Sequence, residues 1–320
     1  MKKVLFINGN DKRIAELFQQ IAPPDFSVVC ISNKDNEEQQ ALLLAEADYL
    51  VLHPAVLSEK LLKAGVNLKL VQALSAGYDQ IDITAAQKRQ IPVATNGGAN
   101  SWAVAEHAIT LLLALYKKLS LSEESVRAGK WRQATDSFNI FEVAGKTVGI
   151  IGAGNIGSKV ARRLKAFETE ILYTNLGKVP DLEKNTGAIR VPLEELLAKS
   201  DILSLHAPLL PSTRGMIGER ELSLMKATSV IINTSRAELI DQAALVNALQ
   251  SNKIAGAGID VFTTEPVSLD DPLLTLANVL VSPHIAGHSC EGWSRRIRFA
   301  WENIRRIEQG EVPLSVVRAE

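Results

Sequence analysis

Three polar side chains with complementary chemistry follow three separate apolar runs of the chain. They are Arg236, Glu265 and His284, which come after the runs 229–234, 254–262 and 278–282, respectively. Runs of this length and composition are typical of β-strands. A guanidinium binds a carboxylate through two parallel hydrogen bonds, and an imidazole can act as a general acid or base. Together these residues could hold a carboxylate ligand and move a proton on it.

The elements that must position them alternate between strand and helix. Strands are expected at 4–7, 27–31, 49–52, 68–73 and 91–94, and again at 147–151, 170–174, 188–191, 201–205, 229–233, 255–261 and 278–282. Helices are expected at 12–21, 37–45, 58–63, 82–88 and 155–166. This alternation predicts parallel sheets with helices on both faces, whose ligands bind beyond the carboxyl ends of the strands. The three polar residues are therefore expected to converge there.

A break in the alternation divides the chain. The segment 96–100, Asn-Gly-Gly-Ala-Asn, is interpreted as a hinge, and a long apolar helix over about 101–118 follows it. A basic amphipathic helix over 291–309 follows Gly287 and is expected to return to the first domain. The predicted domains are 1–99 plus 288–320, and 100–287.

A glycine pattern opens the sheet of the second domain. The strand 147–151 leads directly into Gly152-Ala153-Gly154-Asn155-Ile156-Gly157, where a helix begins. In this context the first glycine permits a tight turn, the second lets a pyrophosphate approach the backbone, and the third lets helix and strand pack closely. The N-terminus of the helix then binds the anion. This segment is predicted to bind a dinucleotide.

The residue after the next strand bears on the choice of cofactor. An Asp or Glu there would bond the ribose of NAD, whereas a basic residue would accept the 2′-phosphate of NADP. The chain has Asn175, with Lys178 three residues on. Without a carboxylate there is no repulsion of a phosphate, so the sequence leans to NADP(H). A neutral Asn can also bond a ribose hydroxyl, which keeps NAD(H) open.

Composition and charge argue against several classes of protein. The 320 residues carry 35 Lys and Arg against 36 Asp and Glu, with no long run of one sign, so no nucleic-acid or polybasic membrane surface is expected. The longest apolar segment, 108–116, is shorter than the roughly 20 residues of a membrane span. Two cysteines without a CxxC pair suit a reducing cytosol. No histidine and carboxylate pair has metal-ligand spacing, so no metal is predicted.

Seven motifs along the chain resemble those of the D-isomer-specific 2-hydroxyacid dehydrogenases, in the same order and spacing. They are Ser-Ala-Gly-Tyr-Asp (75–79), Val-Ala-Glu-His (104–107), the glycine pattern (152–157), His-Ala-Pro-Leu (206–209), Asn-Thr-Ser-Arg (233–236), Asp-Val-Phe-Thr-Thr-Glu-Pro (260–266) and Ser-Pro-His-Ile-Ala-Gly (282–287). The resemblance implies an α/β enzyme with two doubly wound parallel-sheet domains. A Rossmann-type cofactor domain would be inserted in a flavodoxin-like substrate domain, with the active site in the cleft.

The resemblance also implies a role for single residues. Arg236 would bind the substrate carboxylate and carbonyl, His284 would be the acid/base, and Glu265 would pair with His284 and favour its protonated form. The backbone N–H groups of Ala76 and Gly77 would bind the substrate carboxylate. Near them, Tyr78 is a further substrate contact, and His53 is either a substrate contact or loop packing. The residues expected to line the nicotinamide cofactor are Gly152, Gly154, Asn155, Ile156, Gly157, Asn175, Lys178, His206, Ala207, Pro208, Thr213, Thr234, Ser235, Asp260, Ala286 and Gly287.

The predicted protein is a cytoplasmic homodimer that transfers a hydride between NAD(P)(H) and C2 of a D-2-hydroxy acid/2-oxo acid pair. The resemblance implies a dimer contact in 101–140, a region with Trp102, Trp131 and Phe138. His107, on the apolar helix, is interpreted as structural. An alternative on the same fold is a cofactor-sensing binding protein similar to the carboxy-terminal-binding-protein corepressors.

Three positions depart from the usual family pattern. Glu168 and Ala237 stand where glycine is usual, and Asn175 replaces an aspartate. None of them is one of the three chemical groups. The substrate acid and the cofactor preference stay open at this point.

Overall fold

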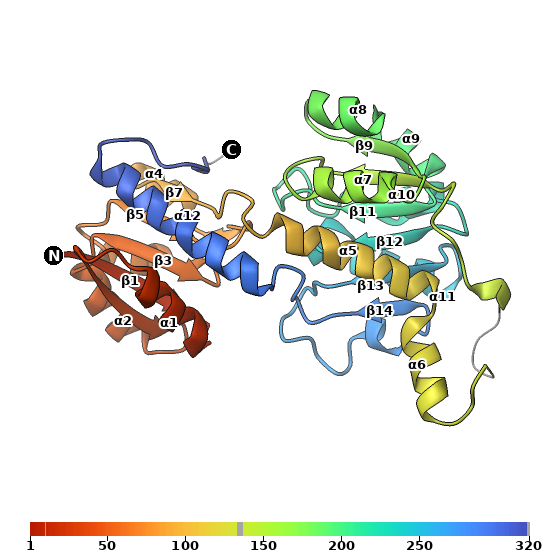
Figure 1. The fold of residues 1–320 in the computed structure, drawn as a ribbon, viewed down its shortest axis with the longest axis horizontal. Helices are drawn as coiled ribbons and strands as arrows, with labels where there is room; N and C mark the ends of the chain where they lie inside the picture. Colours follow the sequence, from red (N-terminus) through yellow and green to blue (C-terminus); the bar gives the residue numbers. More distant parts are fainter. Residues whose placement is uncertain (10, 133–136, 319–320) are drawn as a thin grey trace. The chain divides into compact units, whose positions relative to one another are not determined.

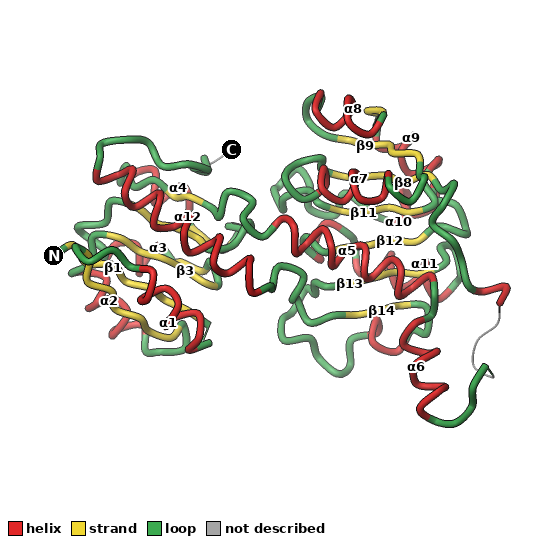
Figure 2. The backbone as a smooth tube through the Cα atoms, in the orientation of Figure 1, coloured by secondary structure: helices red, strands yellow, loops and turns green. Residues whose placement is uncertain are grey.

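The chain forms two compact units in the computed structural model, which describes residues 1–9, 11–132 and 137–318. Unit 1 comprises Met1–Asn100 and His288–Glu320, and unit 2 comprises Ser101–Gly287. Each unit contains a parallel sheet with helices on both faces (Figures 1 and 2). The predicted α/β class with two doubly wound parallel sheets is confirmed.

Unit 1 is built around a five-stranded sheet in the order β2-β1-β3-β5-β7. Its strands are β1 (Lys2–Asn8), β2 (Phe26–Ser32), β3 (Tyr49–His53), β5 (Leu70–Ala73) and β7 (Val93–Ala94). Its helices are α1 (Lys12–Ile21), α2 (Glu37–Ala45), α3 (Glu59–Ala64), α4 (Ile83–Lys88) and α12 (Cys290–Glu308). Strands β4 (Val56–Leu57) and β6 (Gln80–Ile81) form a separate parallel pair. Counted along the sheet, the strand order is the flavodoxin-like 2-1-3-4-5.

The C-terminal helix α12 belongs to the core of unit 1. It packs with α1 on one face of the sheet, where Phe18 of α1 stacks on Trp301 of α12 at a ring-centroid distance of 5.0 Å. Both side chains are buried. Helices α2, α3 and α4 cover the other face.

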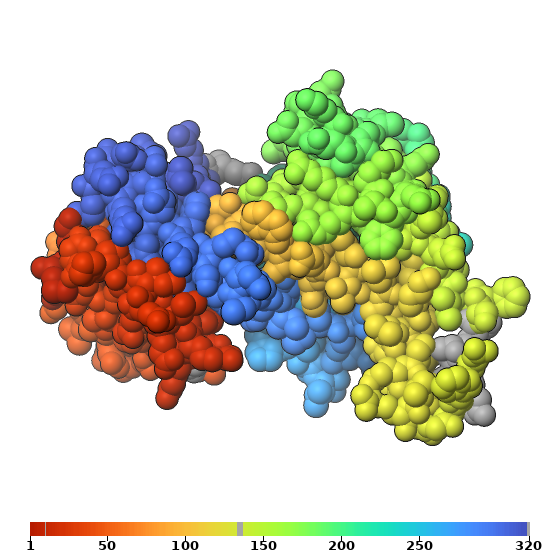
Figure 3. All heavy atoms as spheres, viewed as in Figure 1, coloured from red at the N-terminus to blue at the C-terminus, as the bar shows by residue number. Residues whose placement is uncertain are grey.

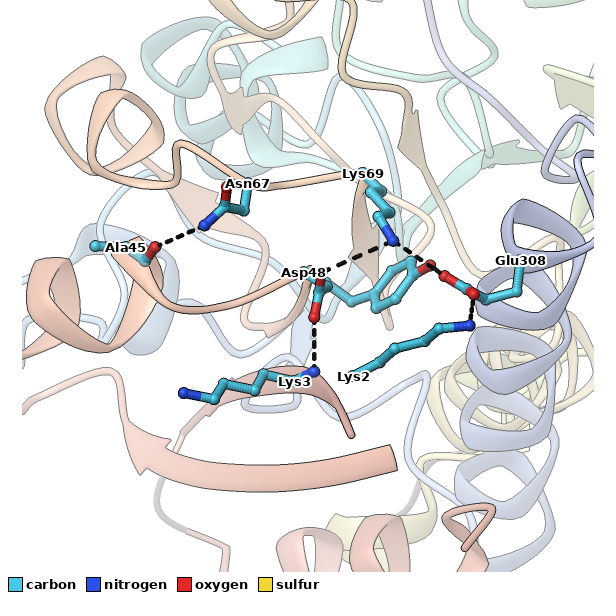
Figure 4. Close-up of polar contacts among 8 residues, drawn as sticks. Lys2, Lys3, Ala45, Asp48, Asn67, Lys69 and Glu308 are labelled. Carbon is cyan, nitrogen blue, oxygen red and sulfur yellow. Dashed lines mark hydrogen bonds and ion pairs between the residues drawn. The ribbon is translucent and has the colours of Figure 1, made fainter. Parts of the chain in front are cut away.

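A polar cluster fixes the end of α12 beside the amino ends of the strands (Figure 4). Glu308 accepts a hydrogen bond from the Tyr49 hydroxyl and forms ion pairs with Lys2 and Lys69, whose Nζ lies 3.3 Å from Oε1. Burial, together with the nearby charge of Asp48, raises the pKa of Tyr49 to about 12. The hydroxyl therefore remains a donor at neutral pH, and the cluster links three strands to the helix.

Unit 2 contains a seven-stranded parallel sheet in the order β10-β9-β8-β11-β12-β13-β14. Its strands are β8 (Thr147–Ile151), β9 (Glu170–Thr174), β10 (Ile189–Arg190), β11 (Ile202–Leu205), β12 (Val230–Asn233), β13 (Gly256–Ile259) and β14 (Val279–Val281). Its α-helices are α5 (Ser101–Tyr116), α6 (Leu119–Arg127), α7 (Gly157–Lys165), α8 (Pro180–Thr186), α9 (Leu193–Lys199), α10 (Glu219–Leu224) and α11 (Gln242–Gln250). Short 3₁₀ turns are η1 (Ser137–Asn139), η2 (Ala237–Leu239) and η3 (Pro272–Thr275). The order is the doubly wound 3-2-1-4-5-6, extended by one strand.

Two apolar clusters cover the faces of this sheet. Helices α5, α7 and α8 contribute to one, and α9, α10 and α11 to the other. Small residues in β13 allow α5 to lie close to the strand: a Cβ at Gly258 would be 3.1 Å from Cβ of Leu111, and one at Gly256 would be 3.5 Å from Leu115. The close approach brings the polar side chains of α5 within reach of the strand ends.

The strands of unit 2 end in one row. Paired positions at the carboxyl ends are Ile151, Leu205, Asn233, Ile259 and Val281. The residues that follow them therefore emerge along a single edge of the sheet, where ligands of such folds bind.

Several predicted boundaries were wrong by a few residues. The strands expected at 255–261 and 278–282 end at Ile259 and Val281, because Asp260 and the residues after β14 hydrogen-bond each other in a turn. The helix expected over 101–118 ends at Tyr116, because Lys118 adopts a left-handed conformation with φ of 49°. Within the described residues, the helices lack the length and apolar character needed to cross a membrane.

Candidate active site

The three residues with complementary chemistry lie in one neighbourhood of unit 2. Arg236 follows β12, Glu265 lies in the loop after β13, and His284 follows β14, and these three strands are neighbours in the sheet. Nδ1 of His284 lies 2.6 Å from Oε2 of Glu265. The side chains are partly exposed, 45% for His284 and 37% for Glu265. The pair is thus formed and remains accessible to a ligand.

The charge state of Glu265 follows from its neighbours. Burial alone would raise the pKa of this carboxyl group. The hydrogen bond with His284, the bond from the Phe262 N–H (3.0 Å) and the charges of His284 and Arg236 act the other way, and the pKa lies below its ordinary value. Glu265 is therefore a carboxylate at neutral pH, with one oxygen on the imidazole and the other on the backbone.

The turn that carries His284 is held by Asp260. His284 has φ of 52°, a left-handed conformation that side chains with a Cβ rarely adopt. Its N–H donates to the Asp260 carbonyl oxygen at 2.8 Å. The Asp260 carboxylate accepts the N–H of Ile285 at 3.0 Å and of Ala286 at 2.9 Å. These three bonds fix the backbone that presents the imidazole.

Asp260 itself is fully buried and receives two further side chains. Ser282 Oγ lies 2.6 Å from Oδ1, and Nε2 of His107 lies 3.4 Å from the same oxygen. Burial alone would raise the pKa of Asp260, but the bonds with His107, with Ser282 and from the backbone lower it. The carboxylate is therefore ionised inside the fold.

Asn233 shapes the turn that carries Arg236. This buried residue ends β12 and donates from Nδ2 to the Arg236 carbonyl at 2.8 Å, while its Oδ1 accepts the Ser235 N–H at 3.0 Å. Ser235 Oγ donates to the carbonyl of Ala207 at 2.6 Å. Sequence reasoning quoted Asn233 only as part of a motif; the signal was a polar residue at the end of an otherwise apolar strand.

The glycine turn after β8 fits a dinucleotide. A Cβ at Gly152 would lie 2.6 Å from the backbone N of Ala207, and its φ of 87° favours glycine. A Cβ at Gly157 would lie 2.1 Å from the Gly152 carbonyl oxygen, so no larger residue fits. At Gly154, by contrast, a Cβ would meet no atom of the described chain within 4 Å. The turn is thus tight on the protein side and open beside the N-terminus of α7, where Asn155 and Ile156 lie and where an anion would bind.

Two predicted cofactor residues next along this edge carry buried polar atoms. His206 follows β11, and its Nε2 lies 2.8 Å from Ser204 Oγ. Its Nδ1 and the hydroxyl of Thr234 are both buried without a hydrogen-bond partner among the residues described. Part of the His206 residue is exposed, but burial of the ring lowers its pKa to about 3, so the imidazole is neutral. These groups leave hydrogen-bonding capacity at the expected cofactor edge.

The remaining cofactor candidates lie in loops of unit 2. Thr213 Oγ1 donates to the Pro208 carbonyl at 2.7 Å and accepts the Leu210 N–H at 2.8 Å, which closes the loop after His206. Asn175 follows β9, and its carbonyl accepts two bonds from Arg190, at 3.1 and 2.9 Å. Lys178 is exposed in the same loop, and Gly287 ends the unit. Sequence reasoning did not select Arg190, which lies in β10 and is distant in sequence from the loop.

The predicted substrate residues belong to unit 1. Ala76, Gly77 and Tyr78 follow β5, and Ser75 Oγ donates to the Gly77 carbonyl at 2.7 Å. His53 ends β3, the neighbouring strand, and its ring lies edge-on to Trp293 at a centroid distance of 4.7 Å. The candidate substrate residues therefore share one sheet edge of unit 1, whereas the three chemical groups belong to unit 2.

The chain matches known proteins over nearly its whole length. Residues 109–286 match the family model for the NAD-binding domain of D-isomer-specific 2-hydroxyacid dehydrogenases. A glyoxylate reductase of Korarchaeum cryptofilum is 40% identical over 307 residues, which cover 95% of this chain and 90% of that protein.

Solved structures agree with this match. An acyclic imino acid reductase in complex with NADPH and D-Arg is 30% identical, with a TM-score of 0.85 over 98% of this chain and 99% of that one. A D-lactate dehydrogenase with NAD⁺ from Lactobacillus jensenii is 27% identical, with a TM-score of 0.80 over 99% and 100% of the two chains. The chain belongs to the D-isomer-specific 2-hydroxyacid dehydrogenase family.

Proposed function

We propose that the protein reduces a small 2-oxo acid to the D-2-hydroxy acid and catalyses the reverse oxidation, with His284 as the acid/base. The observation that carries the proposal is the 2.6 Å contact between His284 and the Glu265 carboxylate, with the charge of Arg236 acting on the same carboxylate. Bound NAD(P)H would supply the hydride that C2 receives. The residues of the chain would supply the proton, the orientation and the charge.

The two ring nitrogens of His284 would have different roles. Nδ1 contacts the ionised Glu265. Nε2 would therefore donate the proton to the carbonyl oxygen in reduction and accept it back in oxidation. Glu265 would keep the ring oriented through this contact. The left-handed backbone of His284, fixed by Asp260, would set the direction of the ring.

Arg236 would hold the other end of the substrate. Its planar guanidinium can bind a carboxylate through two parallel bonds, a geometry that lysine lacks. The same charge would stabilise negative charge that develops on the carbonyl oxygen. The backbone N–H groups of Ala76 and Gly77 are proposed as further carboxylate donors, with Tyr78 and His53 as side-chain contacts.

The cofactor proposal rests on the loop after β9. It contains no carboxylate, and the guanidinium of Arg190 is fastened to the loop by bonds to Asn175 and Leu176 carbonyls at 2.9–3.2 Å. With exposed Lys178 in the same loop, two positive charges are available to a 2′-phosphate. These features favour NADP(H) over NAD(H).

A homodimer joined through the region 101–140 is proposed as the assembly. Helix α6, yellow in Figure 3, lies at the surface of unit 2, and apolar side chains in and near it are exposed. They include Leu119, Val126, Trp131 and Phe138, which is 91% exposed. Residues 133–136 of this region lie outside the described residues.

Turnover with a panel of 2-oxo acids tests the function. NADPH and NADH oxidation would be followed with glyoxylate, hydroxypyruvate, pyruvate and larger 2-oxo acids. His284→Ala should lower kcat by about 100-fold or more, the range of general acid–base catalysis. Arg236→Lys should mainly raise the KM for the oxo acid. Inactivity across the panel with both cofactors, although tryptophan fluorescence reports cofactor binding, would favour the cofactor-sensing binding protein instead.

The cofactor preference has its own test. Arg190→Ala should raise the KM for NADPH about tenfold, the value of one charged hydrogen bond, and leave the KM for NADH within about twofold. Lys184→Ala, an exposed charge on the adjacent helix α8, is the matched control. Equal effects of Arg190→Ala on both cofactors would contradict the assignment.

A further inference from the structure

We infer that His107, on helix α5, is a positioning residue for His284 that acts through Ser282 and Asp260. The inference rests on the proposed role of His284 as the acid/base. The sequence had placed His107 on an apolar helix as a structural residue. The structure places it instead at the end of a hydrogen-bonded chain that leads to the backbone of His284.

The position of His107 follows from the packing of α5. Gly256 and Gly258 in β13 leave room for α5 against the strand, and α5 also packs on β14. His107 therefore faces the residues that follow both strands. Its side chain is 21% exposed, and Nε2 lies 2.8 Å from Ser282 Oγ.

The number of available hydrogens determines which group donates and which accepts in each of these hydrogen bonds. Asp260 is ionised and can only accept, so the single hydroxyl hydrogen of Ser282 points to its Oδ1, 2.6 Å away. Ser282 Oγ must then accept from His107, and the hydrogen of the imidazole lies on Nε2. The same N–H also points toward Oδ1 of Asp260 at 3.4 Å. His107 thus supplies the donor on which the orientation of the Ser282 hydroxyl depends.

Asp260 connects this hydrogen-bonded chain to the turn that carries His284. Its carboxylate holds the N–H groups of Ile285 and Ala286, and its carbonyl holds the N–H of His284. A left-handed residue with a Cβ persists only where its surroundings over-determine it. Loss of the His107 donor would let Ser282 and the Asp260 carboxylate reorient, and the turn would lose part of the constraint that aims His284.

The kinetic test uses three variants in the full-length protein. His107→Leu should lower kcat about tenfold, the upper value of one net hydrogen bond, and leave the KM for the oxo acid within about twofold. His107→Gln, which restores an N–H donor, should recover most of that loss. Thr110→Ala, an exposed position one turn further along α5, should have wild-type kcat. A wild-type kcat for His107→Leu would overturn the inference.

A double-mutant cycle separates positioning from a general loss of stability. Glu265→Gln and His107→Leu both act on the orientation of His284, so their combined effect on kcat should be smaller than the product of the single effects. Multiplicative effects would refute the coupling. If His107→Leu does not fold, Ser282→Ala takes its place in the cycle. It removes the hydroxyl that joins His107 to Asp260, and it changes a smaller side chain.

Hydrogen exchange gives a readout that does not depend on turnover. Amides of Ile285 and Ala286 should exchange about tenfold faster in His107→Leu than in Thr110→Ala, measured by mass spectrometry on peptides that span 282–288. Unchanged exchange in this segment would overturn the inference. If His284→Ala retains activity while exchange accelerates as expected, the proposed function fails and the positioning contact stands.

Discussion

Replacing Glu265 by glutamine tests the reasoning about the active site most directly. The substitution keeps the size of the side chain and an oxygen that can accept from Nδ1 of His284, but it removes the negative charge 2.6 Å from the ring. Because the pKa of Glu265 lies below its ordinary value, the wild-type carboxylate is ionised at every pH of a practical assay. Throughout that range the variant therefore lacks the negative charge. It also lacks one acceptor, because with its oxygen on His284 its amide nitrogen cannot accept the Phe262 N–H that the second carboxylate oxygen accepts.

The size of the effect follows from the contact and its exposure. Hydrogen bonds to charged groups contribute about 1.5–3 kcal/mol, and every 1.36 kcal/mol is tenfold in rate. His284 is 45% exposed and Glu265 37%, so water weakens the interaction and the lower limit applies. We expect kcat for reduction to fall about tenfold in Glu265→Gln.

The pH profile gives the sign of the effect. Because the pKa of Glu265 lies below its ordinary value, its carboxylate acts on His284 at every pH above about 5, and the reduction rate of Glu265→Gln should stay below that of the wild type across this range. The assay is initial rate against pH at saturating cofactor, with Glu219→Gln, an exposed carboxylate of the same unit, as the control. A wild-type profile in Glu265→Gln would show that the carboxylate does not act on His284.

Three further predictions concern stability, and one concerns cofactor binding. Glu168 has φ of 62°, so Glu168→Gly should raise the melting temperature by relieving about 1 kcal/mol of backbone strain, whereas Glu170→Gly in strand β9 should lower it; equal shifts would contradict this. Gly157→Ala should abolish cofactor binding measured by tryptophan fluorescence, because its Cβ would lie 2.1 Å from a carbonyl oxygen. The folded pKa of Asp260 lies below the unfolded value of about 3.9, so its stabilisation is complete above about pH 5 and is lost as the pH falls; urea unfolding of Asp260→Asn should show a flatter acid limb than wild type. Glu308→Gln should lower the free energy of urea unfolding of unit 1 by about 1–3 kcal/mol, because Glu308 joins α12 to three strands, and an unchanged midpoint would contradict this.

The secondary structure was predictable because the hydrophobic periodicity and composition of a short segment indicate whether it forms a strand or a helix. Every strand expected from an apolar run exists, with errors at the boundaries. The two-residue strands β4 and β6 and the helices α6, α8, α9, α10 and α11 were not predicted. The boundary errors have tertiary causes. The strand expected over 255–261 was extended past Ile259 because apolar residues flank Asp260. The Asp260 carboxylate instead accepts hydrogen bonds from the turn after β14, and the strand ends at Ile259.

The candidate site was predictable only for residues whose types and positions in the sequence indicate a chemical role. Arg236, Glu265 and His284 could be selected because their residue types combine into one chemistry. His107 and Arg190 could not be selected in the same way. Each acts on residues far away in the sequence, His107 on Ser282 and Arg190 on Asn175.

The sequence by itself determined the class of the protein: alternating strands and helices, a glycine turn where a pyrophosphate fits, and a cation, a carboxylate and an imidazole after three strands. These are local properties, because glycine conformation, side-chain charge and apolar period do not depend on distant residues. The tertiary structure decided which residues distant in sequence contact each other. Only the parallel register of β12, β13 and β14 brings the three groups to one edge. Only the close packing of α5 on β13 gives His107 a contact with the turn of His284, because a hydrogen bond depends on separation in space, which the chain fixes only when it folds.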